Sequence, residues 1–166
     1  MSAKFGSPTI ASLCHPRGRP FTRSLQHDAS VGFADGYPFL LIGEGSLAEI
    51  NSRVEPHITM ASFRPNVVVT GSAPWEEDYW RQITVGSIEF DVPKPCGRCQ
   101  VPTVDPATGK RRSGYEPIRT MKTYRSDADG EVYCGQNIVH LFNGISSCCC
   151  VLSPSTPAFA LKQRPK

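Results

Sequence analysis

The sequence predicts a mainly β domain with short helices, and three observations support this fold class. The chain has 15 Pro and 14 Gly among 166 residues, which limits long helices and favours frequent turns. Apolar and polar residues alternate on both sides of Gly86-Ser87, which is the pattern of a β-hairpin. Val67 to Val69 is a β-branched run that predicts a buried strand.

The remaining elements follow from apolar runs and from their boundaries. Tyr37 to Ile42 predicts a buried strand, and Ser46-Leu47-Ala48-Glu49 has the form of a capping box that begins a short helix ended by Pro56. Beyond the hairpin, Val101 to Val104 predicts a strand. Pro117 to Arg125 predicts a short helix with proline in its first turn, and Val132 to Leu141 predicts a last strand.

The length of the chain is close to the prior of about 150 residues for one domain. We expect that domain to span residues 30–142, between an atypical leader at 1–29 and an atypical tail at 143–166, both disordered. No acidic residue occurs from Met1 to Gln26, as in transit peptides, although the prolines there oppose an amphipathic helix and favour a disordered leader.

Charge and cysteine usage exclude several classes of protein. The formal charge of +3 is mild, and the one basic cluster, Lys110 to Arg112, follows a strong turn signal, so we expect a solvated loop and no nucleic-acid partner. Seven cysteines, with Cys148 to Cys150 consecutive, fit a disulfide framework poorly. Since no apolar run approaches the roughly 18 residues of a membrane span, we expect no transmembrane segment and an intracellular protein, cytoplasmic or mitochondrial.

The segment Cys96-Gly97-Arg98-Cys99 could carry chemistry in four ways, and its spacing does not choose among them. It could be half of a zinc site completed by Cys134 and His140, a redox-active dithiol, or a pair of buried thiols. In the fourth interpretation one thiolate binds a soft metal and the arginine binds an anionic cofactor. Arg64 and Asn66 could then hold a phosphate and a heterocycle edge, unless Arg64 pairs with Glu76 or Glu77 and Asn66 only completes a turn.

A series of spaced motifs runs through residues 31–141 of the chain. In order, these motifs are FADGYPFLLI, SLAEINSR, FRPNVVV, EDYW, CGRC, TVDPATG, EP, KTYR and GQN. Together they resemble the MOSC domain of the mitochondrial amidoxime-reducing component family, in that family's order. Several motifs in one order are far more specific than a lone pair of cysteines.

The resemblance implies a β-barrel with short peripheral helices and a molybdopterin-type molybdenum cofactor. It assigns the molybdenum ligand to Cys99, places Gly97 and Arg98 against the cofactor, matches Arg64 and Asn66 to positions that contact the pterin phosphate region, and puts Asp35 beside the site. Cys96 is not a ligand in that family. The wider MOSC family also implies pyridoxal phosphate binding.

The activity implied by the resemblance is reduction of small N-hydroxylated compounds, with electrons from a haem-b cytochrome and an NADH-dependent flavin reductase. Related MOSC proteins imply the alternatives of a cofactor or sulfur carrier without turnover. The resemblance stops at both ends of the chain, so we expect a truncated family member in which barrel strands and one wall of the cofactor pocket are missing.

Overall fold

The computed structural model describes residues 36–86 and 88–141 with their side chains, and the backbone of four further strands at 9–13, 19–21, 29–31 and 158–163. Of the residues singled out above, Asp35 lies outside the described part. The predicted domain boundaries stay a prediction.

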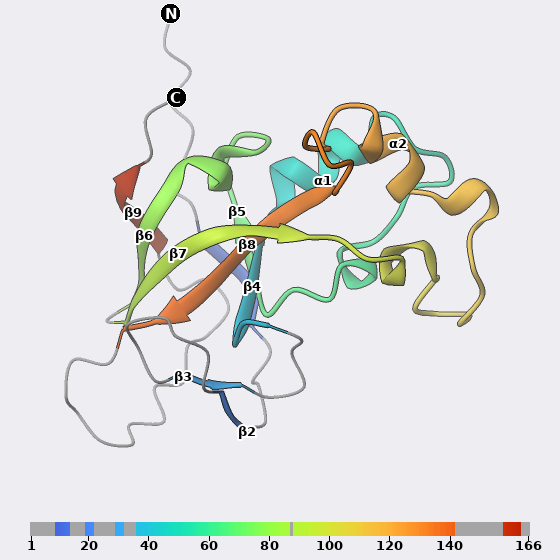
Figure 1. Ribbon diagram of the computed structural model, residues 1–166. Helices are drawn as coiled ribbons and strands as arrows, with labels where there is room; N and C mark the ends of the chain where they lie inside the picture. The colour runs from blue at the N-terminus through green and yellow to red at the C-terminus, as the bar shows by residue number, and fades with distance from the viewer. Residues whose placement is uncertain are drawn as a thin grey trace, which may run out of the picture.

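A curled sheet forms the body of the molecule, with strand order β1-β5-β4-β8-β7-β6-β9, and β2 and β3 form a separate pair (Figure 1). β4 and β5 are parallel, and the other neighbours are antiparallel. The strands are β1 Thr9–Leu13, β2 Arg19–Phe21, β3 Ala29–Val31, β4 Phe39–Gly43, β5 Val67–Thr70, β6 Trp80–Val85, β7 Ile88–Gly97, β8 Tyr133–His140 and β9 Ala158–Gln163.

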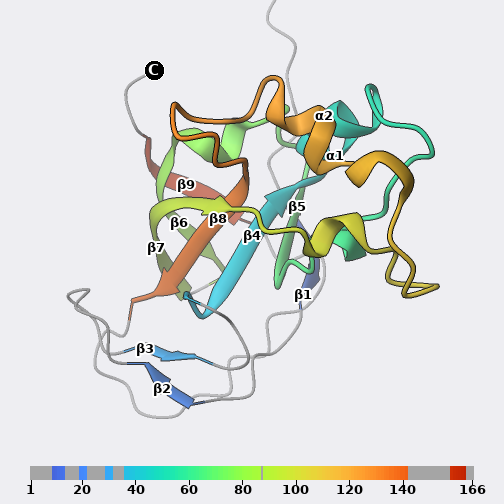
Figure 2. The same ribbon diagram turned by 45° about the vertical axis from the view of Figure 1, so that its right-hand side comes forward.

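Short helices lie beside this sheet rather than within it (Figure 2). The α-helices are α1 Glu44–Asn51 and α2 Ile118–Lys122, and the 3-10 turns are η1 Met60–Ser62, η2 Glu76–Tyr79, η3 Val101–Thr103 and η4 Ser113–Tyr115. The predicted fold class, a mainly β, barrel-like domain with short peripheral helices, is therefore confirmed.

Apolar side chains are buried on both faces of the central strands. Leu41 and Ile138 belong to a cluster inside the curl of the sheet, whereas Ile42 and Cys134 pack with residues of α1 and α2 on the other face. Because side chains alternate along a strand, adjacent residues of β4 enter different clusters. This two-sided burial explains why the central strands read as continuous apolar runs in the sequence.

The structure confirms one local prediction, the hairpin, and corrects two others, the helix cap and the strand from Val101. The hairpin is confirmed, since Val85 pairs with Ile88 around Gly86, whose φ is 60°. The capping box is wrong, because α1 begins at Glu44 and has no side-chain cap hydrogen bond. The strand expected from Val101 is also wrong. The Pro102 nitrogen cannot donate to a strand ladder, and the segment forms η3 instead.

Only glycine fits at position 135, where β8 pairs with β4. Its φ is 75°, and a Cβ there would meet the Leu41 carbonyl oxygen at 2.6 Å and Ile42 Cγ1 at 2.5 Å. Two independent constraints, backbone conformation and space, therefore select glycine at this position.

Replacing Gly135 with alanine should destabilise the fold by about 2–4 kcal/mol, since it combines a strained φ with a clash against backbone. Gly36→Ala is the matched control, because no atom of the described residues lies within 4 Å of its Cβ position and its φ is not in the left-handed region. Urea unfolding followed by circular dichroism measures both. Equal stability of the two variants would contradict the prediction.

Candidate functional site

The Cys96 to Cys99 segment lies where β7 leaves the sheet. Gly97 pairs with Tyr133 of β8, and the Arg98 backbone N–H donates to the Val132 carbonyl at 2.7 Å. Cys96 is half-buried, whereas Cys99, just past this last hydrogen bond, is exposed. The sheet thus fixes the backbone of the segment and presents the second thiol to solvent.

Arg98 joins this segment to the chain before β5. Its Nη2 donates to the Phe63 carbonyl at 2.9 Å, its Nη1 donates to Cys96 Sγ at 3.3 Å, and its guanidinium lies 5.3 Å from the centre of the Phe63 ring. Arg98 Nε is buried and has no hydrogen-bond partner among the described residues. Arg98 therefore holds two loops together and keeps one donor uncommitted.

Arg64 follows directly on Phe63 and is exposed, with a φ of 54°. Within residues 36–86 and 88–141, its guanidinium makes no hydrogen bond or ion pair. The expected alternative of pairing with Glu76 or Glu77 is wrong, because those carboxylates accept from backbone and serine donors instead. The hydrogen bond from Arg98 to the Phe63 carbonyl holds the Arg64 loop next to the cysteine segment, and the Arg64 guanidinium has no partner among the described residues.

Asn66 is tied to β4 by two hydrogen bonds. Its backbone N–H donates to the Leu40 carbonyl at 2.9 Å, and its side-chain Oδ1 accepts from the Leu40 N–H at 2.8 Å. The oxygen of the side chain is thereby used, and its Nδ2 remains as a donor. Asn66 has a structural role that the motif alone did not reveal.

Gly97 packs against the side chain of Glu131. A Cβ at Gly97 would meet Glu131 Oε1, which lies at the end of an exposed side chain that can shift. Glu131 and Asp127 both lie within hydrogen-bond distance of the Tyr133 hydroxyl, at 2.9 and 2.8 Å. The hydrogen bonds to these two carboxylates raise the pKa of Tyr133, and the bond to Asp127 has the larger effect.

The structure brings together most of the predicted site residues. Gly97, Arg98 and Cys99 form one loop and Arg64 lies on another, and the two loops meet at the Arg98–Phe63 contact and again where η3 contacts η1. Asn66 lies two residues beyond Arg64, at the start of β5. The site is therefore a junction of two loops at one end of the sheet.

The zinc interpretation is wrong for the described residues, among which no group of three or more His, Cys, Asp or Glu is placed to hold a metal ion. Cys134 is fully buried in the apolar cluster under the helices, and this burial raises the pKa of its thiol to about 12. A cysteine binds zinc as the thiolate, and burial in an apolar cluster disfavours that form of Cys134. His140 lies at the other end of β8, against the Phe39 ring.

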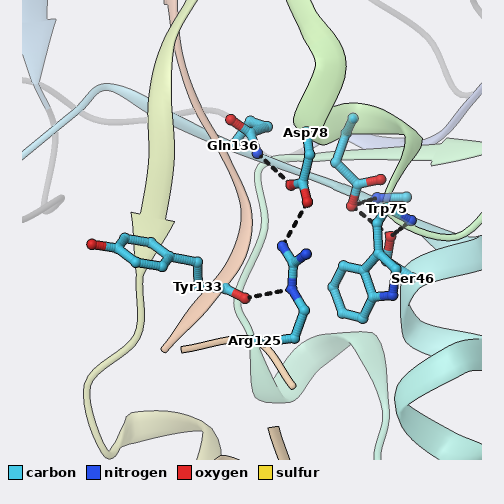
Figure 3. A network of polar contacts seen from close by, with 8 residues as sticks. Ser46, Trp75, Asp78, Arg125, Tyr133 and Gln136 are labelled. Carbon is cyan, nitrogen blue, oxygen red and sulfur yellow. Dashed lines mark hydrogen bonds and ion pairs between the residues drawn. The ribbon is translucent and has the colours of Figure 1, made fainter. Parts of the chain in front are cut away.

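A partly buried polar network, which the sequence motifs did not reveal, supports the start of β8 (Figure 3). Arg125 forms an ion pair with Asp78 at 2.7 Å and donates from Nε to the Tyr133 carbonyl at 3.2 Å. Gln136 donates to the other oxygen of Asp78 at 2.8 Å. The Arg125 guanidinium also lies 4.0 Å from the centre of the Trp75 ring.

Glu77 completes the buried polar interior next to this network. Its Oε1 accepts from Ser46 Oγ at 2.7 Å and from the Gly43 N–H at 3.2 Å, and Ser46 Oγ accepts from the Trp75 N–H at 2.8 Å. Burial raises the pKa of the Glu77 carboxyl, and the Ser46 hydrogen bond opposes that rise. Ser46 was expected to cap α1 and instead joins α1 to η2.

A family model described as MOSC domain matches residues 28–146. The chain belongs to the MOSC domain family. The model covers every described site residue, so the junction of the two loops lies within the family's domain. The expected family membership is therefore confirmed.

Similar proteins carry names that fit this family. The chain is 41% identical over 95 residues to mitochondrial amidoxime-reducing component 1 of Homo sapiens, covering 57% of this chain and 28% of that protein. It is 38% identical over 107 residues to human component 2, covering 64% and 32%. It is 30% identical over 138 residues to component 1 of Xenopus laevis, covering 81% and 40%. The chain thus spans well under half the length of these relatives.

Among solved structures, YiiM from Geobacillus stearothermophilus matches with a TM-score of 0.39 and 16% identity, over 84% of this chain and 77% of that one. No helix in the described residues is long and apolar enough to cross a membrane. None of the comparisons supports the expected pyridoxal phosphate binding.

The raised pKa of Glu77 predicts a pH-dependent stability. Above pH 4.5, the ordinary pKa of the carboxyl group, Glu77 stays protonated in the folded protein but loses its proton in the unfolded chain. The free energy of unfolding should therefore fall as the pH rises from 4.5 through the pKa of Glu77 in the folded protein. Glu77→Gln keeps an oxygen acceptor for Gly43 and Ser46 and should remove this fall.

Denaturant titrations between about pH 4 and pH 8 measure the effect, across the range of ordinary and raised carboxyl pKa values. Glu89→Gln is the control, because Glu89 is an exposed carboxylate on β7. If Glu77→Gln and the parent chain lose stability in parallel over this range, Glu77 is not the group responsible.

Proposed function

We propose that this chain holds a molybdopterin-type molybdenum cofactor at the loop junction and reduces N-hydroxylated compounds. The observation that carries the proposal is the exposed Cys99 thiol on a loop that Arg98 joins to the loop of Arg64. Support also comes from membership of the MOSC family and from relatives named amidoxime-reducing components. The cofactor, the substrate class and the roles of the residues are all part of the proposal.

The chemistry of these side chains fits the cofactor. A thiolate is a soft ligand suited to a covalent metal centre, and Cys99 is exposed on a backbone fixed by β8. The Arg64 guanidinium has no partner among the described residues, and its planar fork matches a phosphate. Arg98 Nε is an orphaned buried donor beside the same loops. The resemblance offers two further candidates for contacting the cofactor, Asn66 through Nδ2 and Asp35.

The residues of this chain would then have separate tasks. Cys99 binds the metal, Arg64 neutralises the phosphate, and Arg98 keeps the two loops at a fixed spacing. The bound metal would supply the two-electron change that, with two protons, converts an N–OH group into N–H and water. Preformed loops limit the ordering that cofactor binding requires, since the Arg98 hydrogen bonds are already made.

Two partners follow from the proposal. The electrons would come from a haem-b cytochrome, itself reduced by an NADH-dependent flavin reductase, as the family resemblance implies. A cofactor or sulfur carrier without turnover is the alternative that related MOSC proteins suggest.

Cys99→Ser should abolish molybdenum binding, because a hydroxyl is a far weaker ligand than a thiolate for a soft metal. Cys96→Ser is the matched control and should retain the metal. Elemental analysis of the purified chains, with fluorescence of the oxidised pterin, measures both. Molybdenum retained in Cys99→Ser, or no molybdenum and no pterin in the folded parent chain, would refute the proposal.

Turnover separates the two candidate functions. The loaded chain, reduced by dithionite, should convert benzamidoxime to benzamidine at a rate that Cys99→Ser reduces to background. Molybdenum bound at Cys99 without any conversion would favour the carrier.

Arg64→Gln should weaken cofactor retention by about tenfold or more, because it removes a charge-assisted contact of roughly 1.5–3 kcal/mol. Arg81→Gln is its control, since Arg81 is an exposed cation on β6. Pterin release during gel filtration measures retention. Identical retention by both variants would remove Arg64 from the site.

A further inference from the structure

The segment that follows Cys99 is the most basic part of the described chain. Residues 98–125 contain seven Lys or Arg and two acidic residues, a formal charge of +5, whereas the whole chain carries +3. The two acids are already committed, because Asp105 lies 3.8 Å from Arg112 and Glu116 pairs with Arg119 at 2.8 Å. Arg125 also pairs with an acid outside the segment, Asp78, at 2.7 Å, so a net charge of +4 remains beside the candidate site (+5 less one for Asp78).

Two large apolar side chains are exposed in the same segment. Val101 is 46% exposed and Tyr115 is 55% exposed, and they are two of the three large hydrophobic residues exposed in the described part of the chain. Tyr115 also has a φ of 61°, a conformation unfavourable for an aromatic residue. The described residues therefore leave much of both side chains uncovered.

A cation joins Tyr115 to Gln100, the residue that precedes Val101. Arg111 Nη1 donates to Gln100 Oε1 at 2.7 Å, and the Arg111 guanidinium lies 5.3 Å from the centre of the Tyr115 ring. Lys110 precedes Arg111 and is exposed. Gln100 and Val101 come directly after Cys99, so the surface adjoins the candidate metal ligand.

The loop that presents Lys110 and Arg111 is held in place from beneath. Arg112 is turned inward, where its N–H donates to the Thr103 carbonyl at 2.7 Å and its Nη1 to the Pro102 carbonyl at 3.2 Å. Val104 and Arg111 also form a β-bridge. The exposure of Lys110 and Arg111 agrees with the predicted solvated loop, and the structure adds that Arg112 anchors this loop to η3.

We propose that Gln100, Val101, Lys110, Arg111 and Tyr115 form the docking surface for an acidic electron-donor protein. An exposed aliphatic and an aromatic residue with cations at the rim match a small, transient interface, in which charge steers the encounter. The inference rests on the proposed function, because the reduction consumes two electrons, and a one-electron haem donor must dock twice in each turnover. A surface next to Cys99 brings that donor close to the metal.

The test measures binding of a small acidic haem-b cytochrome to the full chain by calorimetry, which needs no turnover. The double variant Lys110→Glu with Arg111→Glu should bind about tenfold more weakly or worse. Tyr115→Ser should bind several-fold more weakly. Arg81→Glu is the matched control and should bind like the parent, because β6 lies at the opposite side of the molecule from η3 in both views (Figures 1 and 2).

Salt and a second haem protein provide independent checks. Binding should weaken between roughly 20 and 200 mM salt, since the Debye length falls below about 10 Å. A haem protein with a basic surface should not bind. No binding of the acidic cytochrome, or equal binding by the double variant and Arg81→Glu, would overturn the proposal.

Dithionite-driven turnover separates the failure of this surface from the failure of the proposed function. The double variant should retain that turnover, because dithionite needs no protein docking, and lose only cytochrome-driven turnover. Charge-dependent cytochrome binding without dithionite-driven turnover would support the surface and count against the reductase. Loss of both activities in the double variant would assign Lys110 and Arg111 to the cofactor site and overturn their docking role.

Discussion

Burial of β8 between β4 and β7 is the constraint from which the geometry of the candidate site follows. A central strand must satisfy its polar side chains inside the protein, and Gln136 does so by donating to Asp78. Asp78 in turn holds Arg125, which donates to the Tyr133 carbonyl at the start of β8. The preceding carbonyl, of Val132, accepts from Arg98. One chain of contacts therefore leads from the core to the loop of Cys99.

Sequence patterns predicted the elements whose cause is local. The hairpin around Gly86 and the strand from Val67 depend on side-chain alternation and β-branching, which neighbouring residues reveal. Ser46 shows the opposite case. Its position suited a helix cap, yet its hydroxyl donates to Glu77, 31 residues away. A non-local partner of this kind cannot be read from local spacing.

The candidate site was likewise predictable in part. Spaced motifs identified Arg64, Arg98 and Cys99, but a motif gives no information on what each side chain already contacts. Arg98 uses both terminal nitrogens within the protein, on Phe63 and Cys96, so most of its donors serve the loop junction. Arg64 has no such commitment among the described residues. The two arginines, both assigned to the cofactor by the resemblance, are therefore unequal as ligands for an anion.

The cations that follow Cys99 also differ in how far their charge is used within the protein. Arg112 donates inward to Pro102 and lies near Asp105, whereas its neighbour Arg111 extends outward over the exposed Tyr115 ring. Inward cations stabilise the loop, and outward ones retain their charge for a partner. Because unpaired cations in one small region repel one another, their clustering costs stability unless a ligand or partner offsets it. Arg64 and the pair Lys110 and Arg111 lie on different loops, so a bound anion and a docked protein could each neutralise its own cations.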